Sequence, residues 1–342
     1  MTTTLRAGLL GTAIGLCTAA GAWAQDVTLR LHQFLPEQAA VPRDVLIPWM
    51  ERITEASDGR IAFEHYPAMQ LGGRPPELFD QAADGVADVV WTLPGYTPGR
   101  FPRSEVFELP FMVRDAESAS AALWQMYEDG AFGDEFDRVK VLGLWVHGPG
   151  VVHSAEPVVD VTDMQGLDLR TPTRVTGQLI TELGGNAVGM PVPQVAESLT
   201  RGVIDGAIIP WEVTGAIRSS ELVSNHTEFP DEALYVATFL LAMNQSVYDS
   251  LPDDLKTVID ENSGAAFSEQ AGAATQAADK APRQAAMDMG NNIITLTSEQ
   301  AQEWKDSAHP VIDAWIAEAD AAGLDGQALV DGARAAIESA SN

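Results

Sequence analysis

VTLRLHQF, residues 27–34, begins the alternation of strand and helix that decides the fold of this chain. Apolar residues at every second position predict a strand with one buried face, because successive side chains of a strand point to opposite sides. The segment that follows carries apolar residues at helical spacing: Leu46, Trp49, Met50 and Ile53. We therefore expect an amphipathic helix there, ending before Gly59.

The same alternation continues to residue 92. Residues 61–65 predict a second strand that Pro67 closes, residues 77–84 a second helix, and residues 87–92 a strand buried on both faces. This order of elements favours a mixed or mainly parallel sheet covered by helices.

The pattern then repeats along the middle of the chain. Strands and helices are expected over residues 115–128, 139–146, 167–170, 177–183, 187–190, 194–199 and 203–210, and one long strand over 234–248. The C-terminal part is expected to be helical. An Ala-rich stretch runs from a capping box at Ser250 and Asp253 to residue 289, kinked at Pro282, and helices 298–321 and 326–340 follow. We expect two α/β lobes, because 342 residues exceed what one core usually uses.

The N-terminal residues indicate export. Arg6 precedes an apolar run over residues 7–20, and Ala22-Trp23-Ala24 has the small-x-small form of a cleavage site. We expect residues 1–24 to be removed as a signal peptide and the mature protein to work in the periplasm. Stable membrane insertion is not expected, since no later apolar run reaches the ~20 residues of a membrane span. A lipid anchor at Cys17 is disfavoured because the bulky Leu16 precedes it.

Composition narrows the possible functions further. Twenty Lys and Arg residues against 49 Asp and Glu give a net charge of −29, which repels nucleic acid and anionic lipid. Cys17 is the only cysteine, so the mature chain offers no disulfide, thiolate metal site or cysteine nucleophile. A protein this acidic needs a buried cation to bind an acid.

The usual motifs of catalysis and cofactor binding are missing from the sequence. Its six histidines lack zinc-hydrolase spacing, and no G-x-S-x-G elbow, S-x-x-K motif, P-loop or strand-linked G-x-G-x-x-G occurs. We expect no enzyme activity, no cofactor and no metal. A hydrolase or lyase that uses carboxylates alone remains an alternative, because acid–base carboxylates leave no short motif.

Five segments give the chain a resemblance to a known family. They are SDGRIAFEHYPAMQLGG (57–73), FELPFM (107–112), MQGLDLRTPTRV (164–175), LGGNAVGMPVPQVAESL (183–199) and RGVIDGAIIPWE (201–212). In this order, behind a signal peptide, they resemble the substrate-binding proteins of tripartite ATP-independent periplasmic (TRAP) transporters. The resemblance covers essentially the whole mature chain.

The resemblance implies a two-lobed α/β fold of the periplasmic-binding-protein kind, with mixed sheets flanked by helices, that closes over one small ligand. Long strands and a long helix in the C-terminal half would join the lobes. We assign residues 26–147 and 238–275 to lobe I, and residues 148–237 and 276–342 to lobe II. The expected partners are a small-molecule organic acid and the small and large membrane subunits of a TRAP permease.

The resemblance also implies an arginine that pairs with the ligand's carboxylate, and the matching position here is Arg170. This residue ends the expected strand 167–170, and ligands of α/β proteins bind at such strand ends. A guanidinium can hold a carboxylate with two parallel hydrogen bonds. The alternative is an exposed arginine that pairs with a surface carboxylate.

Departures from the family pattern describe the rest of the expected pocket. The second arginine of dicarboxylate or sialic-acid binders has no counterpart in GPGVVHS (148–154), where His153 is the nearest polar group. Ile209, Leu93 and Val192 stand where relatives carry an asparagine, a carboxylate and an aromatic ring. We expect one anchored carboxylate in a comparatively apolar pocket.

Further candidates follow the expected strand ends. Candidate walls for an aromatic or short hydroxy acid, or else core residues, are Trp91, Tyr96, Phe34 and Trp211. His32 could hydrogen-bond the ligand or lie at the surface, and Arg74 could supply a second cation or begin a surface helix. Metal ligation by Glu212, as in some keto-acid relatives, is disfavoured because the surrounding pattern differs.

These observations predict an extracytoplasmic receptor that captures an organic acid anion and delivers it to a membrane permease. A monocarboxylate with an aromatic or otherwise largely apolar body is favoured. The alternatives are a dicarboxylate or sugar acid in the same fold, and a binding protein of an ATP-driven importer or of a sensor.

Overall fold

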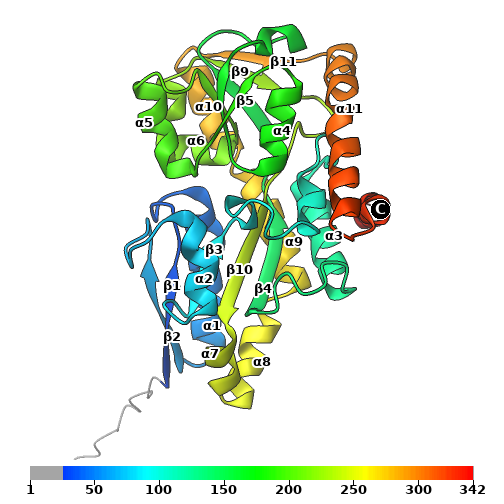
Figure 1. Cartoon of the computed structure of the whole chain (residues 1–342). Helices are drawn as coiled ribbons and strands as arrows, with labels where there is room; N and C mark the ends of the chain where they lie inside the picture. The colour runs from blue at the N-terminus through cyan, green and yellow to red at the C-terminus, as the bar shows by residue number, and fades with distance from the viewer. Residues whose placement is uncertain (1–25, 342) are drawn as a thin grey trace, which may run out of the picture.

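Two β-sheets organise residues 26–341, the part of the chain that the computed structural model describes. Figure 1 shows one sheet above the other, each covered by helices, as the sequence predicts for a two-lobed α/β protein. The expected signal peptide, residues 1–24, lies outside the described residues. Within residues 26–341, no helix is both long and apolar enough to cross a membrane.

Lobe I, the lower part of Figure 1, is built on a five-stranded sheet with the order β2-β1-β3-β10-β4. β1 pairs in parallel with β2 and β3, and β10 runs antiparallel to β3 and β4. The strands are β1 (Val27–His32), β2 (Ile61–Tyr66), β3 (Val89–Thr92), β4 (Val139–Val146) and β10 (Thr238–Asn244). The helices are α1 (Ile47–Ala56), α2 (Leu78–Ala83), α3 (Ala116–Glu128), α7 (Gln245–Ser250), α8 (Asp253–Glu261) and α9 (Ala265–Ala277).

Lobe II is built on a six-stranded sheet with the order β11-β9-β5-β8-β6-β7. β6 pairs in parallel with β7 and β8, whereas β5 runs antiparallel to β8 and β9. The strands are β5 (Gly150–Ser154), β6 (Asp168–Thr171), β7 (Asn186–Gly189), β8 (Gly206–Pro210), β9 (Asn225–Glu228) and β11 (Asn292–Thr295). The helices are α4 (Arg174–Glu182), α5 (Val195–Thr200), α6 (Trp211–Ile217), α10 (Lys280–Asp288) and α11 (Ser298–Ala321).

The chain passes between the two lobes several times. β4 leads into β5 through residues 147–149, β9 into β10 through residues 229–237, and α9 into α10 through residues 278–279. The expected helical connection between the lobes is therefore present as two helices, and the break falls at Ala278 and Asp279. Pro282 lies in the first turn of α10, where a helix tolerates proline.

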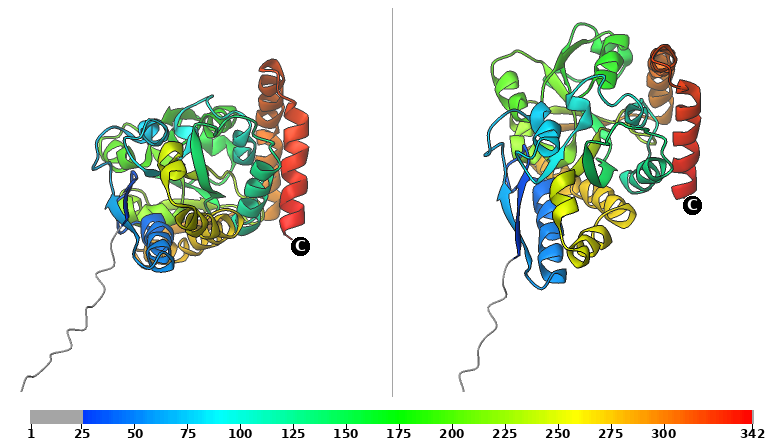
Figure 2. Two further views of the ribbon diagram at one scale, coloured as in Figure 1. Left: turned by 90° about the horizontal axis from the view of Figure 1, so that it is seen from below. Right: turned by 60° about the horizontal axis from the view of Figure 1, so that its bottom comes forward.

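The last helix returns to the first lobe. α12 (Gly326–Ala340) packs against α3 of lobe I, while α11 packs against α4 of lobe II. Figure 2 shows α11 and α12 side by side at one edge of the molecule. The expected boundary placed all of residues 276–342 in lobe II, and the packing of α12 departs from it.

Local sequence explains the elements that position the cavity between the lobes. The apolar stripe of α1 is buried at Trp49 and Ile53, which hold this helix against lobe I. In lobe II, the Thr173 hydroxyl accepts a hydrogen bond from the Thr176 N–H (3.4 Å) and caps the start of α4. Because α4 begins three residues after the end of β6, this cap fixes the turn that follows Arg170 and Thr171.

Most expected elements are present, and α11 and α12 have the expected bounds. The long strand expected over residues 234–248 is β10 alone, because Asn244 ends it by capping α7: its side-chain oxygen accepts from the Val247 N–H (3.0 Å). Pro252 is the N-cap residue of α8, and the Ser250 hydroxyl donates to the Val247 carbonyl instead of forming the expected capping box. Sequence periodicity does not indicate β5, β9 or β11.

Candidate functional site

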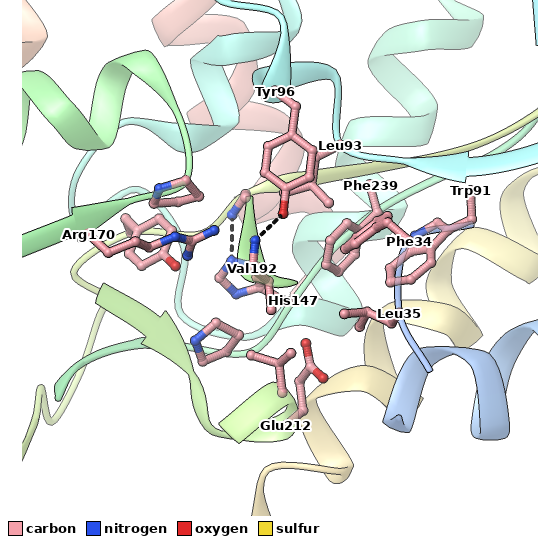
Figure 3. Close-up of a pocket in the computed structure, with 15 residues that line it drawn as sticks. Phe34, Leu35, Trp91, Leu93, Tyr96, His147, Arg170, Val192, Glu212 and Phe239 are labelled. Carbon is pink, nitrogen blue, oxygen red and sulfur yellow. Dashed lines mark hydrogen bonds between the residues drawn. The ribbon is translucent and has the colours of Figure 1, made fainter. Parts of the chain in front are cut away.

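A cavity lies between the lobes (Figure 3). Both lobes and the crossing segments contribute to its walls. The lining residues are Phe34, Leu35, Trp91, Leu93, Tyr96, His147, Arg170, Pro172, Val192, Pro210, Glu212, Val213, Tyr235, Ala237 and Phe239.

Strand ends place these side chains in one cavity. Trp91 lies near the end of β3, Arg170 near the end of β6, and Pro210 ends β8. In α/β proteins, ligands bind outside the carboxyl ends of strands, where the following loops leave a crevice. Here the carboxyl ends of strands from two sheets face each other across that crevice.

Arg170 is the central polar group of the cavity. Its side chain is buried, with 1% of the residue exposed, and two backbone carbonyls hold it: Nε donates to Met190 O (2.9 Å) and Nη1 to Ile208 O (3.3 Å). Nη2 has no hydrogen-bond partner, and no carboxylate among residues 26–341 forms an ion pair with the guanidinium. A buried, unpaired cation is costly, so this arrangement calls for an anion in the cavity.

Two buried tyrosines lie near Arg170. The Tyr96 hydroxyl accepts from the Val192 N–H (3.2 Å), and the Tyr235 hydroxyl donates to Ile208 O (3.1 Å). Burial raises the pKa of both phenols, while the positive charge of Arg170 opposes this shift. Both hydroxyls are therefore neutral at physiological pH and can hydrogen-bond a ligand without adding charge.

His147 contributes a neutral ring. Its Nδ1 donates to Gly148 O (2.5 Å), which leaves Nε2 to accept from the Ala237 N–H (2.9 Å). Burial, with Arg170 adding to the effect, lowers the pKa of His147 to about 4. Arg170 is consequently the one cation among the residues that line this cavity at neutral pH.

An aromatic wall occupies the lobe I side. Phe34 stacks on Trp91 with ring centroids 4.5 Å apart, and Phe239 meets Trp91 edge-on at 5.2 Å. Figure 3 shows these three rings grouped away from the Arg170 guanidinium. Gln33 fixes the turn that carries Phe34, because its amide accepts from the Leu35 N–H (2.5 Å) and donates to Leu35 O (2.8 Å).

Glu212 is the acidic group of the cavity. It is the second residue of α6 and is 4% exposed, and its Oε2 has no hydrogen-bond partner in the described chain. Burial raises the pKa of Glu212 well above its usual value, and the neighbouring Asp279 adds to the shift. Asp279 accepts from the Glu212 N–H (2.7 Å), and burial raises the pKa of its own carboxyl to about 7.

Half of the residues proposed from the sequence line this cavity. They are Arg170, Trp91, Tyr96, Phe34 and Val192. The other five lie elsewhere: Trp211, His153, His32, Arg74 and Ile209. Leu93, noted for the missing carboxylate, also lines the cavity.

His153 and Trp211 belong to a buried cluster of lobe II. His153 Nδ1 lies 2.7 Å from His226 Nδ1, and its ring meets Trp211 edge-on at 4.8 Å. The Trp211 indole donates to Glu228 (2.8 Å) rather than to the cavity. Ile209 is fully buried in β8, where its carbonyl oxygen lies 3.2 Å from His153 Nε2.

His32 and Arg74 have partners of their own in lobe I. His32 Nδ1 lies 2.6 Å from the Gln81 side-chain oxygen, and Nε2 accepts from the Leu71 N–H (3.4 Å), so the imidazole ties loop 67–73 to α2. The Arg74 side chain is 79% exposed and pairs with Glu77 (2.9 Å). Arg74 therefore starts a surface helical turn and supplies no second cation.

The sequence did not allow several of the residues that line the cavity to be predicted. Tyr235 and Phe239 fall inside the long strand expected over residues 234–248, where nothing marks a crossing segment. His147 carries a usable signal, since it directly follows the expected strand 139–146. Leu35 would follow from extending the first strand end by one residue.

Among residues 26–341, no group of three or more His, Cys, Asp or Glu side chains could hold a metal ion.

Comparison with known proteins adds to this geometry. The model of bacterial extracellular solute-binding protein family 7 (DctP) matches residues 34–319. A TRAP solute binding protein from Rhodoferax ferrireducens, solved with copurified benzoate, is 46% identical to this chain; the match covers 92% of this chain and 98% of that one, with a TM-score of 0.91.

Two further solved structures are similar. A marine metagenome TRAP solute binding protein specific for aromatic acid ligands, solved with 3-hydroxybenzoate, is 40% identical, covering 93% of this chain and 100% of its own, with a TM-score of 0.91. A TRAP periplasmic solute binding protein from Bordetella bronchiseptica, with bound (R)- and (S)-mandelate, is 30% identical, covering 92% and 99%, with a TM-score of 0.83.

Proposed function

The chain belongs to the TRAP solute-binding proteins, bacterial extracellular solute-binding protein family 7, and we propose that it captures aromatic monocarboxylates. The expected family resemblance and two-lobed fold are thereby confirmed. As a member of this family, the protein binds an organic acid outside the cytoplasm and works with the membrane subunits of a permease. We also propose that residues 1–24 are removed and that the mature protein works in the periplasm.

One observation carries the choice of ligand: a single buried guanidinium with an unpartnered N–H faces a cavity that is otherwise mostly apolar and aromatic. Charge-assisted hydrogen bonds from Arg170 would hold one carboxylate, at about 1.5–3 kcal/mol each. The Phe34 and Trp91 rings would cover a flat apolar body. The benzoate, hydroxybenzoate and mandelate found in similar proteins support this ligand class.

A dicarboxylate suits the cavity less well. Arg170 is the one cation among the lining residues, so a second carboxylate would meet Glu212 and the aromatic wall without a positive partner. A sugar acid would leave several hydroxyls against Leu35, Leu93 and Val213. We propose that the ligand is released unchanged, and product formation from a bound acid would instead favour a hydrolase or lyase.

Isothermal titration calorimetry on the refolded, ligand-free mature protein tests this proposal. The panel is benzoate, mandelate, succinate and galacturonate. We expect benzoate and mandelate to bind with Kd values near the micromolar level, about 8 kcal/mol, and the other two at least 100-fold more weakly. The absence of a binding signal for every aromatic acid would contradict the proposal.

Arg170→Ala is the decisive variant, because it removes the buried cation. We expect at least 100-fold weaker benzoate binding, since truncating one partner of a buried charge pair costs about 2–5 kcal/mol. Arg74→Ala is the matched control: it removes an exposed arginine and should change the Kd by less than twofold. Unchanged affinity in Arg170→Ala would remove the basis of the proposed site.

A further inference from the structure

The Glu212 carboxyl group is a second polar feature of the cavity, and the pairing of a carboxylate with Arg170 does not use it. Figure 3 shows it entering the cavity from a different side than the Arg170 guanidinium. Glu212 is 4% exposed, and no side-chain hydrogen bond or ion pair joins it to another described residue. Its backbone N–H alone is engaged, by Asp279 (2.7 Å).

A structural role does not explain this side chain. Buried polar groups are almost always hydrogen-bonded, because a buried group without a partner costs about 1–3 kcal/mol. Asp279 lies beside Glu212, but its Oδ1 accepts from the Glu212 backbone N–H, and no hydrogen bond joins the two carboxyl groups in the described chain. The missing partner must therefore come from what fills the cavity.

We propose that Glu212 hydrogen-bonds a hydroxyl group on the ring of the ligand, so that the site selects hydroxylated aromatic acids. This inference rests on the proposed function, since Arg170 first fixes the carboxylate. Glu212 then acts as a positioning and specificity residue at another point of the ring. The aromatic wall of Phe34 and Trp91 holds the ring that joins the two points.

A hydroxyl group is the ring substituent that best suits the environment of the Glu212 carboxyl group. It can donate to an ionised carboxyl group or accept from a protonated one, so it pairs with Glu212 in either protonation state. A second carboxylate would face Glu212 and Asp279 together without a cation. An ammonium group would pair with Glu212 only if the buried carboxyl group were ionised, which its raised pKa opposes.

The position of the hydroxyl follows from the separation of the two groups. A 2-hydroxyl adjoins the carboxylate and stays beside Arg170, whereas a 3- or 4-hydroxyl reaches toward another wall of the cavity. Because Glu212 enters the cavity from a different side than Arg170 (Figure 3), we expect the 3- or the 4-hydroxyl to meet Glu212.

Calorimetry with benzoate and the three hydroxybenzoates tests the inference. In the wild-type protein, the 3- or 4-isomer should bind at least 10-fold more tightly than benzoate, while 2-hydroxybenzoate gains less than threefold. Glu212→Leu should reduce this preference to below threefold, and a cooperative thermal unfolding transition near that of the wild type shows that the variant is folded. Glu212→Gln, which can still donate and accept, should keep most of the preference.

The outcomes separate the two claims. Benzoate binding without a hydroxyl preference in the wild type overturns the role of Glu212 and leaves the proposed function standing. A preference that persists in Glu212→Leu does the same. Absence of binding for all four acids overturns the proposed function, and the inference with it.

Discussion

Arg170 gives the cavity a positive charge although the protein as a whole is strongly acidic. The protein carries a net charge of −29, yet the cavity presents a guanidinium that only backbone carbonyls hold. Carbonyl oxygens orient the guanidinium but leave its charge in place, whereas an acidic side chain would neutralise that charge. The charge therefore remains available to an incoming anion, in a site where little water weakens the attraction.

Glu108 is a second residue whose environment yields a prediction. It is 2% exposed, its Oε1 accepts from the Thr238 N–H (3.2 Å), and its Oε2 has no partner in the described chain. Burial, with the nearby Glu105 adding, raises the pKa of Glu108 to about 8. The folded protein therefore keeps this proton at neutral pH, whereas the unfolded chain releases it near pH 4.5.

The free energy of unfolding should consequently fall as the pH rises from 4.5 to 8, because only the unfolded state ionises easily in that range. Glu108→Gln cannot ionise. Its stability relative to the wild type should rise by on the order of 4 kcal/mol across this range. Urea denaturation at pH 4.5, 6 and 8 measures the difference, with the exposed Glu156→Gln as control. A difference that does not change with pH would contradict this assignment.

At the residue scale, the sequence predicts the cavity residues that lie at or just after a strand end. It does not predict those whose side-chain direction depends on tertiary packing. Arg170, Trp91 and Tyr96 follow from the positions of β3 and β6 alone. Trp211 also follows a strand end, but its indole turns to Glu228 and joins a cluster with His153. No pattern in one chain distinguishes these two directions, because the partner lies on β9.

At the scale of elements, one close approach joins the two lobes beside the cavity. Gly95 follows β3 in lobe I, and a Cβ atom at this position would lie 2.5 Å from Cγ2 of Thr173, which caps α4 in lobe II. Turning the Thr173 side chain away would break the cap. Glycine thus allows the lobes to meet here.

Gly95→Ala should weaken benzoate binding at least 10-fold, because the added methyl group obstructs the approach of the lobes. The unfolding temperature should change less than the affinity does, because the contact of the added Cβ within lobe I, with Glu108 Oε1 at 3.2 Å, is looser than the one with Thr173. Gly189→Ala is the matched control, as no atom lies within 4 Å of the added Cβ. Calorimetry gives the affinity, and small-angle scattering with saturating benzoate gives the degree of closure. Equal affinities for the two variants would contradict this account.

Elements with strong local signals were predictable, and elements that depend on pairing were not. α11 starts at a reciprocal cap between Thr297 and Gln300, and its bounds match the expectation. β9 has the sequence NHTE and β11 the sequence NIIT, so neither shows clear alternation. They are strands because they pair in parallel with each other at the edge of the second sheet.

At the scale of the whole molecule, contacts between lobes surround the cavity. Arg174 of α4 reaches Glu105 of lobe I (2.5 Å) and also pairs with Glu318 of α11. The Tyr96 hydroxyl of lobe I accepts from the Val192 N–H of lobe II (3.2 Å). These contacts require the lobes to be together, so ligand affinity and closure are linked in this fold.

The acidic surface is compatible with uptake of an acid when salt is present. At 0.15 M ionic strength, charges further apart than about 8 Å are largely screened, so the repulsion of an approaching anion is short-ranged. Within the closed cavity the nearest charge is Arg170, whose attraction is not screened in this way. The molecule can therefore stay highly charged outside while it binds an anion inside.

A crystal structure of the wild-type protein with benzoate tests the central claim most directly. We predict a carboxylate oxygen within about 2.7–3.1 Å of Arg170 Nη2, with the phenyl ring against Phe34 and Trp91. A carboxylate bound elsewhere, with the Nη2 donor still unpartnered, would contradict it.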